Sequence, residues 1–250
     1  MLIYSIVKGF AGEFEHIQRN AVRSWQTVFP QAQIVWFGQD EPGAAEEAEA
    51  NGIQLMPMRR TEKGAPLLPD VIDSAHKLAR SRDTRCLINA DIVLEPQFAT
   101  AVQAVEDRFS NFLLITRRRN IQVDDELDFS EDWHGMIKDL PFTDYTRSGI
   151  DVFCYRGDWL RDIPPFGVGR TAWDNWIVSW ADKQEKLPII DATGFTVVYH
   201  QQHAKHKPQG EVMRNQAIWQ QALVEFEKPG TLNSATWKLT EKGQLVEKGA

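Results

Sequence analysis

An amide and an acid two residues apart interrupt an otherwise apolar segment, Cys86-Leu-Ile-Asn-Ala-Asp-Ile-Val-Leu94. In a β-strand, residues 89 and 91 point to the same face. If the strand ends there, both side chains project from the carboxyl edge of a sheet, where open α/β sheets bind ligands. Oxygen ligands at that edge suit Mg²⁺ or Mn²⁺, and either cation can bind the oxygens of a diphosphate. The sequence therefore predicts a metal and diphosphate site at Asn89 and Asp91, with simple capping of the strand end as the alternative.

A second candidate is the segment Ile163-Pro-Pro-Phe-Gly-Val-Gly-Arg-Thr-Ala-Trp-Asp-Asn-Trp176, in which glycines and prolines predict a loop followed by a helix. Asp174 and Asn175 are residue types that begin helices, and N-capping alone would explain them. Their neighbours Trp173 and Trp176 favour a function, because aromatic faces pack on the apolar side of a sugar while an acid takes a hydroxyl proton. We therefore expect a sugar-binding floor around Asp174.

A third candidate holds three histidines in Tyr199-His-Gln-Gln-His-Ala-Lys-His206. The spacing of three would suit one helical face and a zinc site. However, the residues before it are typical of a strand, and no H-E-x-x-H pattern is present. We expect a loop in which one histidine reaches a metal held elsewhere, while His203 and His206 are solvated or hydrogen-bonded.

Weaker signals come from residues that follow expected strands. Lys8 begins a loop after the first strand, but the loop lacks the G-x-G-x-x-G order, which disfavours a Rossmann dinucleotide site. Gly64, in the turn 61–66, is a candidate for the same edge, although a surface turn is the simpler interpretation. Arg117, Arg118 and Arg119 would balance diphosphate charge, but we expect at least two of them in an exposed basic turn.

The elements that must position these residues alternate along the first half of the chain. Strands are expected at 2–7, 34–37, 53–58, 85–94, 112–116, 150–155 and 196–200, and helices at 13–29, 44–50, 67–81, 96–109, 173–182 and 211–228. Such alternation predicts an α/β fold with a mostly parallel central sheet and helices on both faces. Residues 120–147 are polar and acidic and predict a long loop over the site. We expect one domain, residues 1–210, with a C-terminal appendage, residues 211–250, packed on it.

Composition narrows the class of protein. The 250 residues carry 28 basic and 35 acidic side chains, so the net charge is 28 − 35 = −7, which disfavours a nucleic-acid partner. No apolar run approaches the roughly 20 residues that span a bilayer, and the N-terminus lacks the order of a signal peptide. Cys86 and Cys154 lie in apolar runs and predict buried thiols and a cytoplasmic protein. Peripheral membrane association and oligomeric state are left open.

With these segments assembled, the chain resembles the GT-A-type glycosyltransferases, and especially a group of mostly uncharacterised bacterial and viral proteins linked to polysaccharide or glycoconjugate assembly. The resemblance rests on Ile88-Asn-Ala-Asp-Ile92, Gly149-Ile-Asp-Val-Phe153, Ile163–Arg170 with Trp173-Asp-Asn-Trp176, and His200-Gln-Gln-His203. A weaker match is Glu211 with Asn215, followed by Leu232–Trp237. These stretches occur in order over nearly the whole chain. The resemblance implies a GT-A, Rossmann-like fold and a metal-dependent transfer of a sugar from a nucleotide sugar to a glycan acceptor.

The resemblance also implies roles for individual residues. The family's Asp-x-Asp motif falls on Asn89 and Asp91, so the first acid is an amide here, and the late metal-contacting histidine falls on His200. Asp174 becomes the general base if the anomeric centre inverts, and holds the acceptor if configuration is retained. Asp151 is the rival base. Lys8, Gly64 and Arg118 are further donor-side candidates, and Arg170, Trp173, Asn175 and Trp176 are acceptor-side candidates.

Other classes of function remain open at this point. A sugar-phosphate nucleotidyltransferase shares the fold class but needs a glycine-rich, arginine-bearing loop after the first strand, which residues 8–12 match poorly. A non-catalytic carbohydrate-binding protein would use Trp173, Trp176 and Trp180 as its platform. A zinc hydrolase would use the three histidines. None of the patterns identifies the donor sugar, the nucleotide base or the acceptor.

Overall fold

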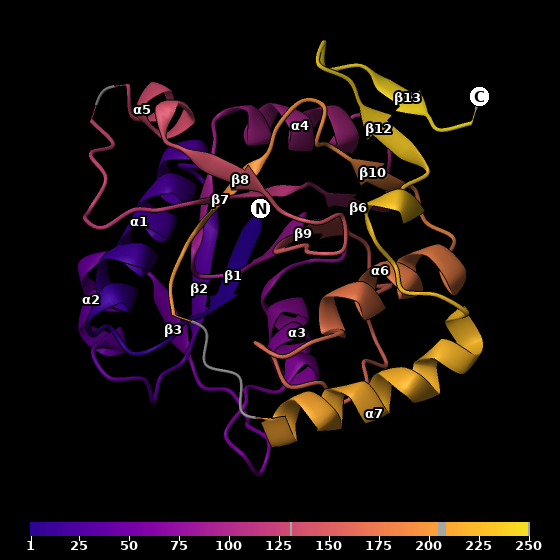
Figure 1. The fold of residues 1–250 in the computed structure, drawn as a ribbon, viewed down its shortest axis with the longest axis horizontal. Coiled ribbons are helices and arrows are strands. Elements are labelled where there is room, and N and C mark those ends of the chain that lie inside the picture. The colour runs from indigo at the N-terminus through magenta and orange to yellow at the C-terminus, as the bar shows by residue number, and fades with distance from the viewer. Residues whose placement is uncertain (131, 205–208, 250) are drawn as a thin grey trace.

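A computed structural model describes residues 1–130, 132–204 and 209–249, and the side chains of 209 and 211 are outside that description. Nine strands in this part of the chain form one mixed, mostly parallel sheet (Figure 1). Its spatial order is β13 (Leu245–Glu247), β12 (Trp237–Leu239), β10 (Ile189–Asp191), β6 (Phe112–Ile115), β9 (Val152–Arg156), β4 (Arg85–Ile88), β1 (Leu2–Ile6), β2 (Gln33–Phe37) and β3 (Gln54–Met56). A second sheet has the order β5 (Ile92–Leu94), β11 (Val198–Gln201), β7 (Arg118–Ile121) and β8 (Phe142–Asp144).

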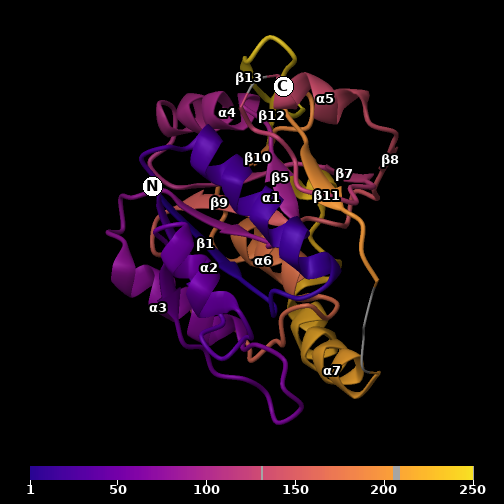
Figure 2. The same cartoon turned by 90° about the vertical axis from the view of Figure 1, so that its left-hand side faces the viewer.

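Helices cover both faces of the large sheet (Figures 1 and 2), as the sequence predicts. One core cluster contains residues of α1 (Glu13–Val28), α2 (Ala44–Ala50), α4 (Gln97–Glu106) and α5 (Trp133–Asp139). The other contains residues of α3 (Leu68–Leu78), α6 (Trp173–Lys183) and α7 (Gln209–Phe226). Successive residues of β1 point to opposite faces, so Ile3 belongs to the first cluster and Leu2 and Tyr4 to the second. The fold is therefore an α/β layered structure in a single domain.

The apolar segment 85–94 is two strands rather than the single strand expected from its composition. β4 pairs with β1 and β9 in the large sheet, whereas β5 pairs with β11 in the small sheet. The chain changes sheet in a turn, where the backbone N–H of Ile92 donates to the carbonyl of Asn89 at 3.1 Å. Asn89 and Asp91 therefore lie in that turn, at the carboxyl end of β4, and not within a strand.

The described residues of the predicted loop 120–147 contain more regular structure than their polarity predicts. β7 pairs in parallel with β11 and antiparallel with β8, and α5 begins where the Asp132 carboxylate accepts a hydrogen bond from the N–H of Gly135. The expected exposed basic turn is also wrong. Arg118 is buried in β7, and Arg117 and Arg119 both form ion pairs with Asp144. Charge pairing across strands, which local composition does not reveal, explains the difference.

The C-terminal residues extend the same domain. α7 packs along α6, as Figure 1 shows, and β12 pairs in parallel with β10 at the edge of the large sheet. The 3₁₀ turn Leu232–Ser234 links the two segments. Among the described helices, none has the length and apolar character needed to cross a membrane.

Candidate active site

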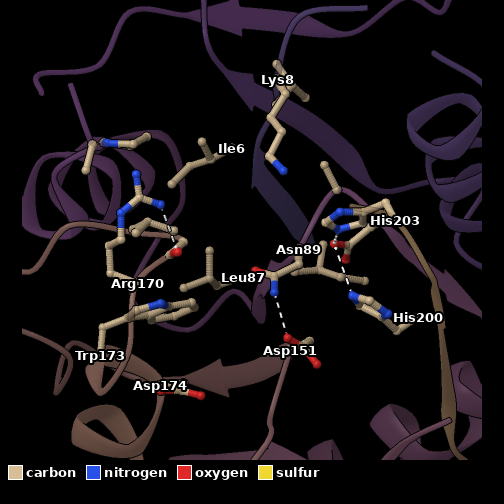
Figure 3. A pocket seen from close by; sticks show the side chains of 18 of the residues that line it. Ile6, Lys8, Leu87, Asn89, Asp151, Arg170, Trp173, Asp174, His200 and His203 are labelled. Carbon is tan, nitrogen blue, oxygen red and sulfur yellow. Dashed lines mark hydrogen bonds and ion pairs between the residues drawn. The ribbon is translucent and has the colours of Figure 1, made fainter. Parts of the chain in front are cut away.

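A cleft of about 780 Å³ opens at the carboxyl ends of β1 and β4, within the size range of small-molecule sites. Residues from segments far apart in the sequence line it (Figure 3). All but one of the residues predicted from the sequence are among them: Lys8, Gly64, Asn89, Asp91, Arg118, Asp151, Arg170, Trp173, Asp174, Asn175 and His200. The exception is Trp176.

Strand topology explains this convergence. β1 and β4 are parallel neighbours, so the residues that follow them, Lys8 and Asn89, emerge at one edge of the sheet. β9 runs antiparallel to β4, so Asp151, which precedes β9, starts at that same edge. The Asn89 backbone N–H donates to the Asp151 carbonyl at 3.1 Å, which holds the two residues opposite each other. β11 lies antiparallel to β5 and places His200 opposite Ile92, beside Asp91.

One corner of the cleft holds a carboxylate between two imidazoles. Asp91 Oδ2 lies 3.1 Å from His203 Nε2 and 3.5 Å from His200 Nε2. Burial opposes ionisation of Asp91, but hydrogen bonds and charge from the two histidines outweigh burial and hold the pKa of Asp91 well below its usual range. The same contact with Asp91 raises the pKa of His203. This corner is therefore built around a negative charge.

The same three residues fit a divalent transition metal. Their ligand atoms lie within 4.8 Å of one another. Asp91 Oδ1 is buried and has no hydrogen-bond partner among the described residues, and His200 faces Asp91 through Nε2. His203 Nδ1 lies 2.9 Å from the carbonyl of Ala204, which leaves Nε2 facing Asp91. Two imidazoles and one carboxylate suit Mn²⁺ better than Mg²⁺, which prefers oxygen ligands alone.

Asp151 is engaged through both carboxylate oxygens. Asn89 Nδ2 donates to Oδ1 at 2.7 Å, and Arg118 Nη1 donates to Oδ2 at 2.7 Å. Asp151 is only 8% exposed, and this burial raises its pKa although the Arg118 guanidinium opposes the rise. Arg118 also lies over the ring of Tyr145, 3.8 Å from its centroid. A carboxylate held in this way is poorly placed to accept a proton from a ligand.

Asp174 occupies the opposite wall, at the start of α6 (Figure 3). Burial raises the pKa of Asp174 to about 7, with the charge of Asp151 adding to the rise and backbone hydrogen bonds and Arg118 opposing it. A carboxyl group with this pKa exchanges a proton near neutral pH, which is the property of a general base or acid. Of the two predicted bases, Asp174 is the one whose environment suits the role.

Cations line the remaining wall. The Gln18 side chain makes two hydrogen bonds with the backbone of Lys8, at 2.7 and 3.0 Å, and so fixes the loop after β1. Figure 3 shows the Lys8 side chain directed towards Asn89, and desolvation lowers the pKa of its amine. Arg170 Nη1 donates to the Gly169 carbonyl, and no carboxylate of the described residues forms an ion pair with Arg170. This wall suits an anionic ligand.

Trp176 does not belong to the sugar-binding floor that the sequence predicts around Asp174, and that part of the prediction is wrong. Trp176 is 2% exposed, and its ring packs against Phe166 and stacks on Trp180 in the core. The reason is helix periodicity, since residue 176 lies on the face of α6 that packs inwards. Trp173 lines the cleft but is only 5% exposed. Asn175 also lines it, although its amide nitrogen donates to the carbonyls of Ser148 and Gly230.

His203 is the residue that sequence reasoning left as a solvated or hydrogen-bonded loop histidine. His203 contacts Asp91 and belongs with His200 to the cluster whose geometry could hold a metal, and the H-x-x-H spacing from His200 was the available signal. The sequence analysis expected only one histidine in this cluster. His206 lies outside the described residues.

Comparison with known proteins bears on the fold. The chain matches no protein-family model and no curated protein. Among solved structures, S. aureus TarS 1–349 in complex with UDP-GlcNAc aligns over 89% of this chain and 66% of that chain, with 11% identity and a TM-score of 0.56. TarS 1–349 alone aligns over 80% and 60%, with 15% identity and a TM-score of 0.50. This chain thus spans less than two thirds of their length.

A third structure, from Bacillus anthracis, is provisionally named a glucose-1-phosphate thymidylyltransferase. It aligns over 88% of this chain and 95% of that chain, with 10% identity and a TM-score of 0.45. A TM-score this low supports no conclusion about the fold or activity of this chain. The alignments with TarS, together with the sheet order, show that this chain has the GT-A fold.

Proposed function

We propose that this protein is a glycosyltransferase that moves a sugar from a nucleoside-diphosphate sugar to a hydroxyl group of an acceptor in glycan or polysaccharide assembly. The observation that supports the proposal is the presence, across one cleft, of a carboxylate between two imidazoles, which fits a divalent metal, and an acid whose pKa is raised to about 7. Inverting transfer needs both, because charge develops on the departing nucleoside diphosphate while the attacking hydroxyl loses a proton.

The donor would bind along the Asp91 side. Asp91, His200 and His203 would hold the divalent metal, Mn²⁺ or Mg²⁺, which when bound supplies stabilisation for the charge on the diphosphate. Lys8 extends into the cleft beside this corner and would add positive charge to the diphosphate subsite (Figure 3). Gly64, with a φ of 87°, places backbone at the cleft edge without a side chain in the way.

The acceptor would bind along the wall formed by the start of α6. Asp174 would accept the proton of the attacking hydroxyl, and Arg170 and Asn175 would orient the acceptor. Trp173 exposes little of its ring to this space. We therefore propose that it shapes the wall of the acceptor site and does not stack broadly on a sugar. A purely carbohydrate-binding function is less well supported, because Trp176, the centre of its expected aromatic platform, lies in the core.

The experiment that tests this function is a thermal-unfolding screen of nucleotides and nucleotide sugars, each with Mn²⁺, with Mg²⁺ or with EDTA. A ligand at 100 times its Kd stabilises the native state by roughly 2.7 kcal/mol. For a chain of this length that corresponds to an increase in Tm of about 5 °C or more. We expect one nucleoside-diphosphate sugar to give this shift with Mn²⁺ and a smaller one with EDTA.

A positive screen leads to a direct assay with the same donor. Release of the nucleoside diphosphate on addition of a glycan acceptor supports transfer. Release of pyrophosphate from a nucleoside triphosphate and a sugar phosphate would instead identify a nucleotidyltransferase. A protein that binds glycans with no effect of nucleotide or metal would contradict both enzymes.

A further inference from the structure

The hydrogen bond between positions 89 and 151 joins an amide to an acid in an unusual arrangement. The segment Asn89-Ala-Asp91 carries an amide at its first polar position, and Asp151, directly opposite across the β4–β9 pairing, carries a carboxylate. Asn89 Nδ2 and Asp151 Oδ1 are 2.7 Å apart. An ionised carboxylate only accepts hydrogen bonds, so this contact forces the amide nitrogen towards Asp151.

That orientation fixes where the other end of the amide points. Figure 3 shows the Asn89 nitrogen directed at Asp151, with the amide oxygen turned into the cleft that Asn89 lines. The second oxygen of Asp151 is occupied by Arg118, whose Nη1 is 2.7 Å away. A single buried carboxylate therefore sets both the direction of a hydrogen-bond acceptor and the position of a guanidinium in the cleft.

Charge balance indicates why the acid is at position 151. A second acid at position 89 would place two carboxylates within hydrogen-bond distance of each other, where like charges repel strongly. With the acid on the strand side of β9, the charge is instead neutralised by Arg118 and lies behind the amide rather than in the cleft. Compared with an acid at position 89, the negative charge lies at position 151, on the other side of the hydrogen bond between the two side chains.

We propose that the acid and the amide at positions 89 and 151 are coupled parts of one unit, in which Asp151 is a positioning residue. Resting on the function proposed above, this unit directs the Asn89 oxygen into the donor side of the cleft and holds Arg118 in place. Asp151 does not take the proton of the acceptor.

The test is an exchange of the two side chains. Asn89→Asp alone places two carboxylates opposite each other. Asp151→Asn alone places two amides opposite each other and leaves Arg118 without its carboxylate partner. Each is expected to raise the donor Kd at least about 10-fold, as is typical of breaking a charged buried hydrogen bond. The double variant N89D/D151N restores one acid, one amide and the hydrogen bond between them, although Arg118 then faces an amide instead of a carboxylate. Its donor Kd is therefore expected to lie below that of either single variant and above the wild-type value.

The measurement is isothermal titration of the nucleoside-diphosphate sugar that gives the largest shift in the screen, with Mn²⁺ present, followed by kcat and KM for transfer. Recovery of kcat in N89D/D151N supports positioning, because residue 151 is then an amide that cannot accept a proton. A matched control is Q103E/D107N, which exchanges an amide and an acid 2.8 Å apart at the exposed C-terminal end of α4, where Gln103 is in the helix and Asp107 follows it. It is expected to leave the donor Kd unchanged.

Three outcomes overturn the inference. A double variant no better than Asp151→Asn means that the two positions act separately. Loss of kcat in both variants that carry the Asp151→Asn change, at saturating donor, returns Asp151 to the role of base. A wild-type protein that binds no nucleotide sugar overturns the proposed function as well, and so the two failures are told apart. Circular dichroism and Tm of each variant establish that it is folded.

Discussion

Asp91 and Asp174 are the same residue type in the same cleft, yet their surroundings give them opposite properties. Two imidazoles surround Asp91 and hold its pKa below the usual range, so it stays charged. Asp174 has no imidazole partner among the described residues, and burial raises its pKa to about 7. The comparison teaches that two aspartates in one cleft differ in charge state near neutral pH, and the function proposed above assigns a cation to the first and a proton transfer to the second. Separating the pKa values of two acids is a general way to assign them different roles.

The largest effect is expected when the Asp91 carboxylate, which lies between His200 and His203, is removed. Asp91→Ala is expected to reduce Mn²⁺ affinity by more than the roughly 10–100-fold that outer-shell partners contribute, and to abolish transfer. Titration of Mn²⁺ measures the first effect, and release of nucleoside diphosphate measures the second. Asp144→Ala, which removes an exposed acid of β8, is the control. Unchanged Mn²⁺ affinity in Asp91→Ala would remove this residue from the metal site.

The opposite wall is tested by Asp174→Asn, which keeps the shape of the side chain and removes its basicity. We expect kcat to fall roughly 10²–10⁴-fold, the contribution typical of a general base, with donor Kd within about 3-fold. Because the base must be ionised and the pKa of about 7 is that of the free protein, wild-type kcat/KM should rise with pH through about 7, and the variant should lose that rise. Among the charged side chains that act on the Asp174 carboxyl, Asp151 raises its pKa and Arg118 lowers it. Lost donor affinity would place Asp174 on the donor side instead.

The smallest expected effect is on stability and has a defined direction. In the unfolded chain an aspartate ionises near pH 4, whereas folded Asp174 keeps its proton to about pH 7. Ionisation is therefore more costly in the native state, and stability is lost as pH rises from about 4 to 7. The Asp174→Asn variant has no carboxyl group to ionise, so its stability does not fall in this way. Its Tm relative to wild type should therefore be a few °C higher at pH 8 than at pH 5, because 1 kcal/mol corresponds to about 2–4 °C in a chain of this length. Equal Tm differences at both pH values would contradict the raised pKa.

Much of the site could be predicted from residue types and local order. Lys8, Asn89 and Asp91 follow strands, and residues that follow parallel strands meet at one edge of a sheet. Asp174 stands at a loop-to-helix boundary, where α/β folds place ligand-binding groups. His203 was missed because H-x-x-H spacing in a loop does not specify which side chains turn towards a common point.

Two predictions failed for reasons that local sequence does not contain. Trp176 follows Asp174 by two residues, but the inward face of α6 is set by the sheet it packs against, and this face buries the ring. The basic triplet 117–119 is typical of an exposed turn for at least two of its residues, yet β7 pairs with β11, a strand far along the chain, and Arg117 and Arg119 form ion pairs with Asp144.

By itself, the sequence determined the alternation of strands and helices, the α/β class and most of the residues that line the cleft, because hydrophobic periodicity and strand ends are local properties. The tertiary structure alone decided which acids are free and which are engaged. The pKa of Asp174, the ion pair of Asp151 and the two imidazoles beside Asp91 all depend on groups brought together from distant segments. Desolvation and charge act through space, so chemical roles within this cleft follow from the fold.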